Sequence, residues 1–222
     1  MEKKFQDLPA RYNKYSDEDM IRESLSFYEE MKQRRTIRFF SEKPIPGEVI
    51  ENCIRTASTA PSGANCQPWH FVVITDPDVK KTLRNESEKN EIEFYNKKAP
   101  QEWLNALAPL KTNEDKPFLE KAPCLIVIFV KRYDIDEQGE IVKQYYLNES
   151  IGIATGMLIT ALHKAGLGTL TYTPSPMGFL NKVCNRPENE RAYMVVVVGH
   201  PADDCTVPDL ERKDLEDITT FI

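Results

Sequence analysis

The chain has 222 residues, 41% hydrophobic and 29% charged, which suits one globular domain and excludes disorder as its main state. Its 35 acidic and 29 basic residues give a net charge of −6 at pH 7, which argues against a general nucleic-acid-binding protein. No apolar run reaches the roughly 18 residues of a membrane-spanning helix, and the N-terminus is polar. We expect a cytoplasmic protein without nucleic-acid or membrane partners.

Two helices are predicted in the first sixty residues. Ser16 and Asp19 have the spacing of a capping box, and the helix that follows is expected to end at the arginines near residue 34. Pro46 and Gly47 open a second helix, which closes at Ala60 and Pro61. Each helix is followed by a polar motif, so both helix ends are candidates for positioning a site.

Four strands are predicted over residues 69–74, 124–130, 169–173 and 194–198, because each is a short apolar or β-branched run bounded by breakers. Residues 124–130 and 194–198 are continuously apolar, which indicates burial on both faces of the sheet. Helices are therefore expected to cover the sheet.

Residues 145–165 predict a helix that is apolar on nearly every side, ending at Gly166. Such a helix needs partners on every side, and Gly152 and Gly156 would permit a close approach. Both a subunit interface and packing in the core of one chain account for this pattern.

Residues 77–121 differ from the rest, because they are long, charged and poorly periodic. Trp103, Leu107 and Leu110 form a short amphipathic stripe within them. A polar insertion of this length in a compact domain is typical of a lid or a binding segment.

The chemistry-bearing residues do not indicate a metal or disulfide site. The five scattered cysteines lack a CxxC pair, only three histidines are present, and the common hydrolase, NTPase and dinucleotide motifs are absent. We therefore predict no metal site.

Two short segments are candidate ligand sites. Arg34, Arg35 and Arg38 could chelate a phosphate, or could simply favour the C-terminal end of the first helix. The loop 61–69 offers hydroxyl, backbone and amide groups that could contact a planar polar ring, although an ordinary helix-to-strand turn has the same composition.

Four motifs occur in order along the chain: RRTIR at 34–38, APSGANCQPW at 60–69, GTLTYTP at 168–174 and PDLERK at 208–213. Together they resemble the FMN-binding nitroreductase superfamily, and more closely its iodotyrosine deiodinase branch. The resemblance spans residues 30–218, nearly the whole chain. It implies an α+β fold with a mixed central sheet of four to five strands covered by helices, in a homodimer whose subunits exchange terminal segments.

The resemblance implies FMN as cofactor and assigns residues to it. The phosphate group would be held by Arg34, Arg35, Thr36, Arg38 and Arg212, and the ribityl chain and ring edge by Pro61, Ser62, Gly63 and Asn65. Thr173 would hydrogen-bond flavin N5, which favours electron transfer in single steps. Thr171 competes for the same role, and an ordinary strand threonine remains an alternative for either residue.

The resemblance also implies a halotyrosine substrate. Glu91, Tyr95 and Lys116 would grip its ammonium and carboxylate groups, and Glu91 and Tyr95 stand four residues apart, on one face if this part is helical. The backbone amide of Ala64 would meet the substrate phenolate. The insertion 77–121 would act as a substrate lid on a single domain 1–222, with NAD(P)H or another reductase as external electron donor.

Two other functions stay open on the sequence. Asn65 and Gln67 also match the wider nitroreductase pattern, which favours a general NAD(P)H-dependent nitroreductase or quinone reductase. A non-catalytic halotyrosine- or flavin-binding protein would use the same residues without releasing halide.

Overall fold

The computed structural model describes residues 15–97, 100–102, 105 and 112–222. The chain forms two compact units, and the boundary between them in the sequence lies between Arg34 and Arg35. The first unit contains helix α1 (Asp17–Lys32). The predicted capping box is present, because the Ser16 hydroxyl accepts the Asp19 amide and the Asp19 carboxylate accepts the Ser16 amide. The predicted single domain stays a prediction.

The second unit contains a four-stranded sheet in the order β1-β2-β6-β5, with β1 (Trp69–Ile74), β2 (Cys124–Lys131), β5 (Gly168–Tyr172) and β6 (Glu190–Gly199). All four predicted strands are confirmed, and β6 begins four residues earlier than predicted. The three strand pairings are antiparallel. The parallel component of the expected mixed sheet is a single bridge between Thr36 and Thr169.

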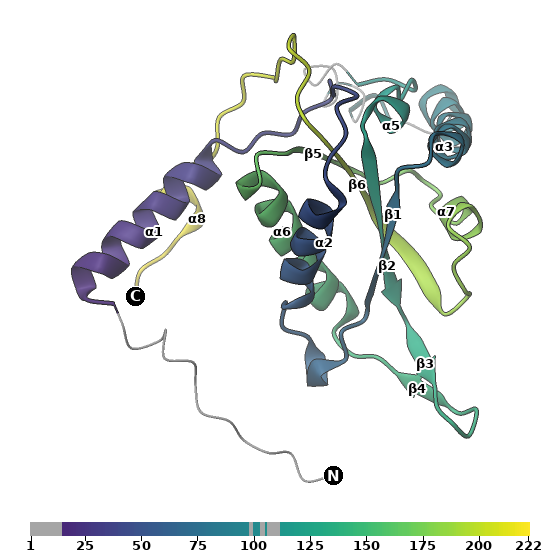
Figure 1. Ribbon diagram of the computed structural model, residues 1–222, viewed down its shortest axis with the longest axis horizontal. Coiled ribbons are helices and arrows are strands. Elements are labelled where there is room, and N and C mark those ends of the chain that lie inside the picture. The colour runs from purple at the N-terminus through teal and green to yellow at the C-terminus, as the bar shows by residue number, and fades with distance from the viewer. Residues whose placement is uncertain (1–14, 98–99, 103–104, 106–111) are drawn as a thin grey trace. The chain divides into compact units, whose positions relative to one another are not determined.

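Helices cover both faces of this sheet (Figure 1). One face packs against α2 (Gly47–Ser58) and α6 (Leu147–Lys164), and the other against α3 (Pro77–Lys97), α5 (Phe118–Lys121) and α7 (Phe179–Val183). The apolar strand β2 is buried along all but its last residue, as its sequence predicts, because it lies between two helical layers.

Helix α6 buries one stripe inside the chain rather than its whole surface. Ile151, Ala154, Leu158 and Leu162 are fully buried, whereas the Ile153 side chain is 45% exposed. Core packing therefore explains only part of the apolar pattern of this helix. Gly166 follows its C-terminus with a positive φ of 79°, as the sequence predicts.

The polar segment 77–121 begins with a regular helix that periodicity did not reveal. Helix α3 has 21 residues, and Leu83 is completely buried in the core. The buried Lys80 ammonium donates to the carbonyls of Glu120 and Ala122, which explains how a helix rich in charge packs on the sheet. The lid function stays a prediction, and the Trp103, Leu107 and Leu110 stripe lies outside the described residues.

Several small elements were not predicted from the sequence. They are a β-hairpin of β3 (Tyr133–Ile135) and β4 (Ile141–Lys143), the 3₁₀ turn η2 (Gly63–Asn65), and the short helices α5, α7 and α8 (Leu215–Ile218). Among the residues that the structure describes, no helix is both long and apolar enough to cross a membrane.

Candidate functional site

A buried ion pair lies between α3 and the segment that leads into α5. The Lys116 Nζ is 3.4 Å from the Glu91 Oε2, and the two side chains are only 4% and 12% exposed. The Lys116 ammonium also donates to the Asn113 carbonyl. Burial lowers the pKa of Lys116, and the Glu91 carboxylate opposes this shift. Two of the predicted substrate residues, 25 positions apart in the sequence, are thus in direct contact.

Two tyrosines enclose this ion pair. The Lys116 Nζ lies 5.4 Å from the centre of the Tyr95 ring and 5.9 Å from that of the Tyr172 ring. The Tyr172 hydroxyl donates a 3.0 Å hydrogen bond to the Glu91 Oε1. Burial raises the pKa of both tyrosines, so their hydroxyls stay protonated and can donate at neutral pH. We call Glu91, Tyr95, Lys116 and Tyr172 the clamp.

Tyr172 was not predicted as a site residue. It stands on β5 between the two candidate threonines, and its ring packs edge-to-face on Phe118 with centres 5.7 Å apart. A signal was available in the sequence, because a tyrosine at a core position of a strand needs a partner for its hydroxyl. The identity of that partner, Glu91, depends on the packing of α3 and could not be read from the sequence.

The clamp suits a small molecule that carries both charges. A carboxylate can pair with a ligand ammonium, a lysine can pair with a ligand carboxylate, and a phenol can hydrogen-bond to either. In the structure, these groups satisfy one another. A ligand must therefore replace the internal contacts of the clamp with its own.

A pocket of about 340 Å³ lies close to the clamp, within the second unit. Its walls are formed by Thr36, Arg38, Phe39, Thr112, Asn113, Asp115, Pro117, Phe118, Thr206, Val207 and Pro208. Within the described part of the chain, the buried Arg38 Nε has no hydrogen-bond partner. Burial also lowers the pKa of this guanidinium. A buried N–H of a guanidinium without a protein acceptor is suited to an anionic ligand oxygen.

The other predicted arginines occupy different places. The Arg35 Nη2 donates to the Pro208 carbonyl, which ties the start of the second unit to the pocket wall. Arg34 belongs to the first unit, and the half-buried Arg34 amide donates to the Met31 carbonyl. Arg212 is exposed and is not part of the pocket wall. The structure thus brings Arg35, Thr36 and Arg38 together at this pocket wall.

The loop between α2 and β1 has an unusual backbone. Ala64, Asn65 and Gln67 have φ values of 49°, 57° and 49°, in the left-handed region that non-glycine residues seldom adopt. The Ser62 hydroxyl accepts the Gln67 amide at 3.0 Å. A side chain at Gly63 would collide with the ring of Tyr146, since a Cβ there would lie 2.5 Å from Cδ2. The loop is therefore held in one shape, with Pro61, Ala64 and Asn65 exposed.

The candidate threonines lie on or beside β5. Thr171 pairs with Val196, whose side chain packs in the α2 and α6 layer, so Thr171 faces away from the clamp, while Tyr172 faces toward it. Thr173 directly follows the strand, and both threonines are exposed. The Ile37 amide donates to the Thr169 carbonyl at 3.1 Å, so the arginine segment runs along the same strand. Strand β5 thus carries or adjoins the candidate threonines, the clamp and the arginine segment.

Comparisons with known proteins agree on one family. A model described as the nitroreductase family matches residues 31–200. The iodotyrosine deiodinase of Haliscomenobacter hydrossis is 52% identical over 207 residues, which cover 93% of each chain. Human iodotyrosine deiodinase 1 is 42% identical over 222 residues, all of this chain and 77% of the human one.

Solved structures agree with this result. A crystal structure of oxidised iodotyrosine deiodinase bound to FMN and 3-iodo-L-tyrosine is 31% identical, with a TM-score of 0.74 over 88% of this chain and all of that one. A nitroreductase with bound FMN from Bacteroides fragilis is 20% identical, with a TM-score of 0.62 over 88% of this chain and 97% of that one. The second likeness shows the fold alone.

Proposed function

Because the chain belongs to the nitroreductase family, and within it to the iodotyrosine deiodinases, we propose that it is an FMN-dependent enzyme that removes halide reductively from halotyrosines. The observation that carries this proposal is the buried Glu91–Lys116 pair, which matches the two charges of an amino acid. In the reaction, two electrons and one proton replace the carbon–iodine bond by a carbon–hydrogen bond, and iodide leaves.

In this proposal the clamp selects and orients the substrate. The Glu91 carboxylate takes the substrate ammonium, Lys116 takes the carboxylate, and the Tyr95 hydroxyl donates a hydrogen bond to the bound zwitterion. Because Lys116 and Glu91 are nearly buried, the substrate charges are withdrawn from water as they bind. The backbone amide of Ala64, in the strained loop, donates to the substrate phenolate and favours phenols that ionise easily.

The residues around the pocket fit the phosphate of FMN. Arg38 offers a buried N–H that has no protein acceptor among the described residues, Thr36 adds a hydroxyl, and Arg35 lies behind the pocket wall. Arg34 and Arg212 complete the set in this proposal, and Pro61, Ser62, Gly63 and Asn65 contact the remainder of the cofactor. Bound FMN would supply the two electrons, after its own reduction by NAD(P)H or by a separate reductase.

Thr173 is the proposed hydrogen-bond donor to flavin N5. Its hydroxyl is exposed directly after β5, where it can reach a ligand without disturbing the strand. Thr171, which lies on β5 two residues earlier, is the alternative.

We also propose that two chains form the working enzyme. Three large side chains at the start of α6 or just before it are exposed: Tyr145 (58%), Tyr146 (70%) and Ile153 (45%). This part of the chain therefore offers apolar surface for a second copy.

The proposed location of the enzyme is the cytoplasm. All five cysteines are unpaired, which is typical of a reducing compartment.

The proposal is tested by reducing the FMN-loaded protein anaerobically with dithionite, with and without 3-iodotyrosine, while iodide is assayed. We expect one iodide and one tyrosine per two electrons delivered, with NAD(P)H assayed separately as donor. Full reduction without iodide release would contradict the proposal. Rapid turnover of nitroarenes with NADPH under the same conditions would instead favour a general nitroreductase.

A further inference from the structure

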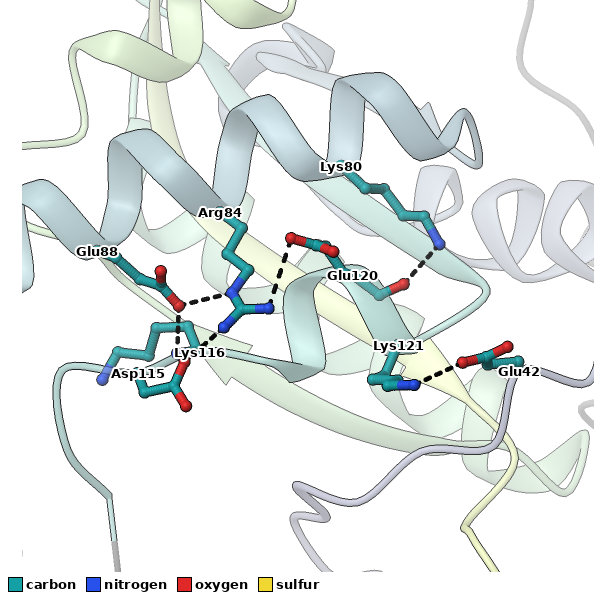
Figure 2. A network of polar contacts seen from close by, with 8 residues as sticks. All are labelled: Glu42, Lys80, Arg84, Glu88, Asp115, Lys116, Glu120 and Lys121. Atoms are coloured by element: carbon teal, nitrogen blue, oxygen red, sulfur yellow. Dashed lines mark hydrogen bonds and ion pairs between the residues drawn. The ribbon is translucent and has the colours of Figure 1, made fainter.

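A polar network joins α3 to the segment that carries Lys116, as Figure 2 shows. Arg84 lies at its centre. The Arg84 Nε contacts the Glu88 Oε1 at 2.6 Å, and its Nη2 and Nη1 contact the carboxylates of Asp115 and Glu120 at 2.5 Å and 3.5 Å. Besides Glu88, the Arg84 guanidinium on α3 therefore contacts one carboxylate that precedes Lys116 in the sequence and one that follows it.

Glu88 connects this network to the clamp. The same Oε1 that contacts Arg84 also accepts the backbone amide of Lys116 at 2.8 Å. Glu88 stands one helical turn before Glu91, so both carboxylates come from the same stretch of α3. The two charges of the clamp come from separate segments, and the Glu88 carboxylate fixes one segment to the other.

We propose that Glu88 and Arg84 are positioning residues, which set the separation of the Glu91 carboxylate and the Lys116 ammonium and thereby the selectivity for α-amino-acid zwitterions. This inference rests on the proposed function. An α-amino acid carries its two charges on adjacent carbons, so a clamp that grips both must keep a fixed spacing. Neither Glu88 nor Arg84 needs to touch the ligand.

The energetics favour this role over that of a simple surface ion pair. The side chains of Arg84 and Glu88 are 24% and 22% exposed, and the planar guanidinium holds Glu88 in a single orientation by a charge-assisted bond. Loss of Glu88 leaves the Lys116 amide without its acceptor, and residues 113–117 can then shift. Such a shift weakens a ligand that needs both charges more than one that needs neither.

The test compares 3-iodotyrosine with 2-iodophenol, which keeps the ring and halogen but lacks the zwitterion. Their dissociation constants are measured from quenching of flavin fluorescence in the oxidised, FMN-loaded protein. For Glu88→Ala we expect 3-iodotyrosine binding to weaken about tenfold or more, as loss of a charge-assisted hydrogen bond predicts, with 2-iodophenol binding unchanged.

Conservative variants distinguish positioning from folding. Glu88→Gln keeps an oxygen that can accept the Lys116 amide, so a smaller selective loss is expected. Arg84→Lys removes the fork and should also weaken 3-iodotyrosine selectively, which decides the matter if Glu88→Ala does not fold. The matched control is Glu86→Gln, which breaks an exposed pair with Lys89 on the same helix and should change neither constant.

Equal weakening of both ligands in these variants, or no weakening of either, would overturn the inference. Failure of the proposed function has a different signature. In that case the unmodified protein itself would bind 3-iodotyrosine no more tightly than 2-iodophenol.

Discussion

The clamp and the arginine pocket, both in the second unit, differ in how their polar groups are satisfied. In the clamp, Glu91 has both Lys116 and Tyr172 as partners. In the pocket, the buried Arg38 Nε has no partner among the described residues. A site whose groups satisfy one another costs little while it is empty, whereas a guanidinium with a buried, unpartnered N–H favours permanent occupancy by an anion. This contrast is what we expect of a site for an exchanging substrate and a site for a resident cofactor.

The largest expected effect is in the clamp. Glu91→Gln removes the carboxylate and leaves the 4% exposed Lys116 side chain without its counter-charge. Loss of one partner of a buried charge pair costs about 2 to 5 kcal/mol, so halotyrosine affinity should fall by about 30-fold to several thousand-fold. Titration of the FMN-loaded variant with 3-iodotyrosine measures this loss. Retention of flavin is the internal control. An affinity equal to that of the wild-type protein would exclude a role for Glu91 in binding the substrate.

A substitution in the pocket should weaken binding of the cofactor rather than of the substrate. Arg38→Ala should weaken FMN binding by about tenfold to a hundredfold, because a charge-assisted hydrogen bond contributes roughly 1.5 to 3 kcal/mol. In the flavin-free protein, the same substitution removes a buried N–H that has no partner among the described residues, so the melting temperature should not fall. Flavin content and melting curves of both forms test these statements. Full flavin retention by the variant would place the phosphate elsewhere.

A paired substitution locates the hydrogen-bond donor to the flavin. Thr173→Ala should reduce the separation between the two one-electron steps when the ligand complex is titrated anaerobically, while Thr171→Ala should leave it unchanged. Absorbance spectra recorded during the titration report the separation. The reverse result would assign the role to Thr171, and no change in either variant would indicate a backbone donor.

The smallest effect is expected at Tyr172. Tyr172→Phe keeps the ring against Phe118 and removes only the hydrogen bond to Glu91. A hydrogen bond to a carboxylate contributes roughly 1.5 to 3 kcal/mol, but this one holds Glu91 in the free and in the ligand-bound protein alike, so 3-iodotyrosine affinity should change by only part of it, about two- to tenfold. Flavin fluorescence titration is sensitive enough to detect it. A loss as large as that of Glu91→Gln would mean that Tyr172 contacts the ligand directly.

The sequence predicted the sheet better than it predicted the layer that carries the clamp. Strand β2 was evident because a strand buried on both faces is apolar throughout. Helix α3 was hidden because Lys80 and Arg84 pack through hydrogen bonds to other segments rather than through an apolar stripe. Periodicity in the sequence predicts which positions are buried by apolar packing, but it does not predict polar contacts between segments that are distant in the sequence.

The candidate site shows the same limit. Glu91 and Lys116 were found because the family resemblance named them, and the structure places them in contact. Tyr172, Glu88 and Arg84 were missed, because their roles depend on which residue lies opposite in space. A carboxylate on a charged helix looks solvated in the sequence, although Glu88 accepts the backbone amide of a residue 28 positions away.

The most direct test of this account removes each charge from the ligand rather than from the protein. The FMN-loaded enzyme is titrated with 3-iodotyrosine, with N-acetyl-3-iodotyrosine, which lacks the ammonium, and with 3-iodotyrosine methyl ester, which lacks the carboxylate. We predict that each modification weakens binding by about 30-fold or more, because it leaves Glu91 or Lys116 buried without a partner. Equal affinity for all three ligands would contradict the clamp.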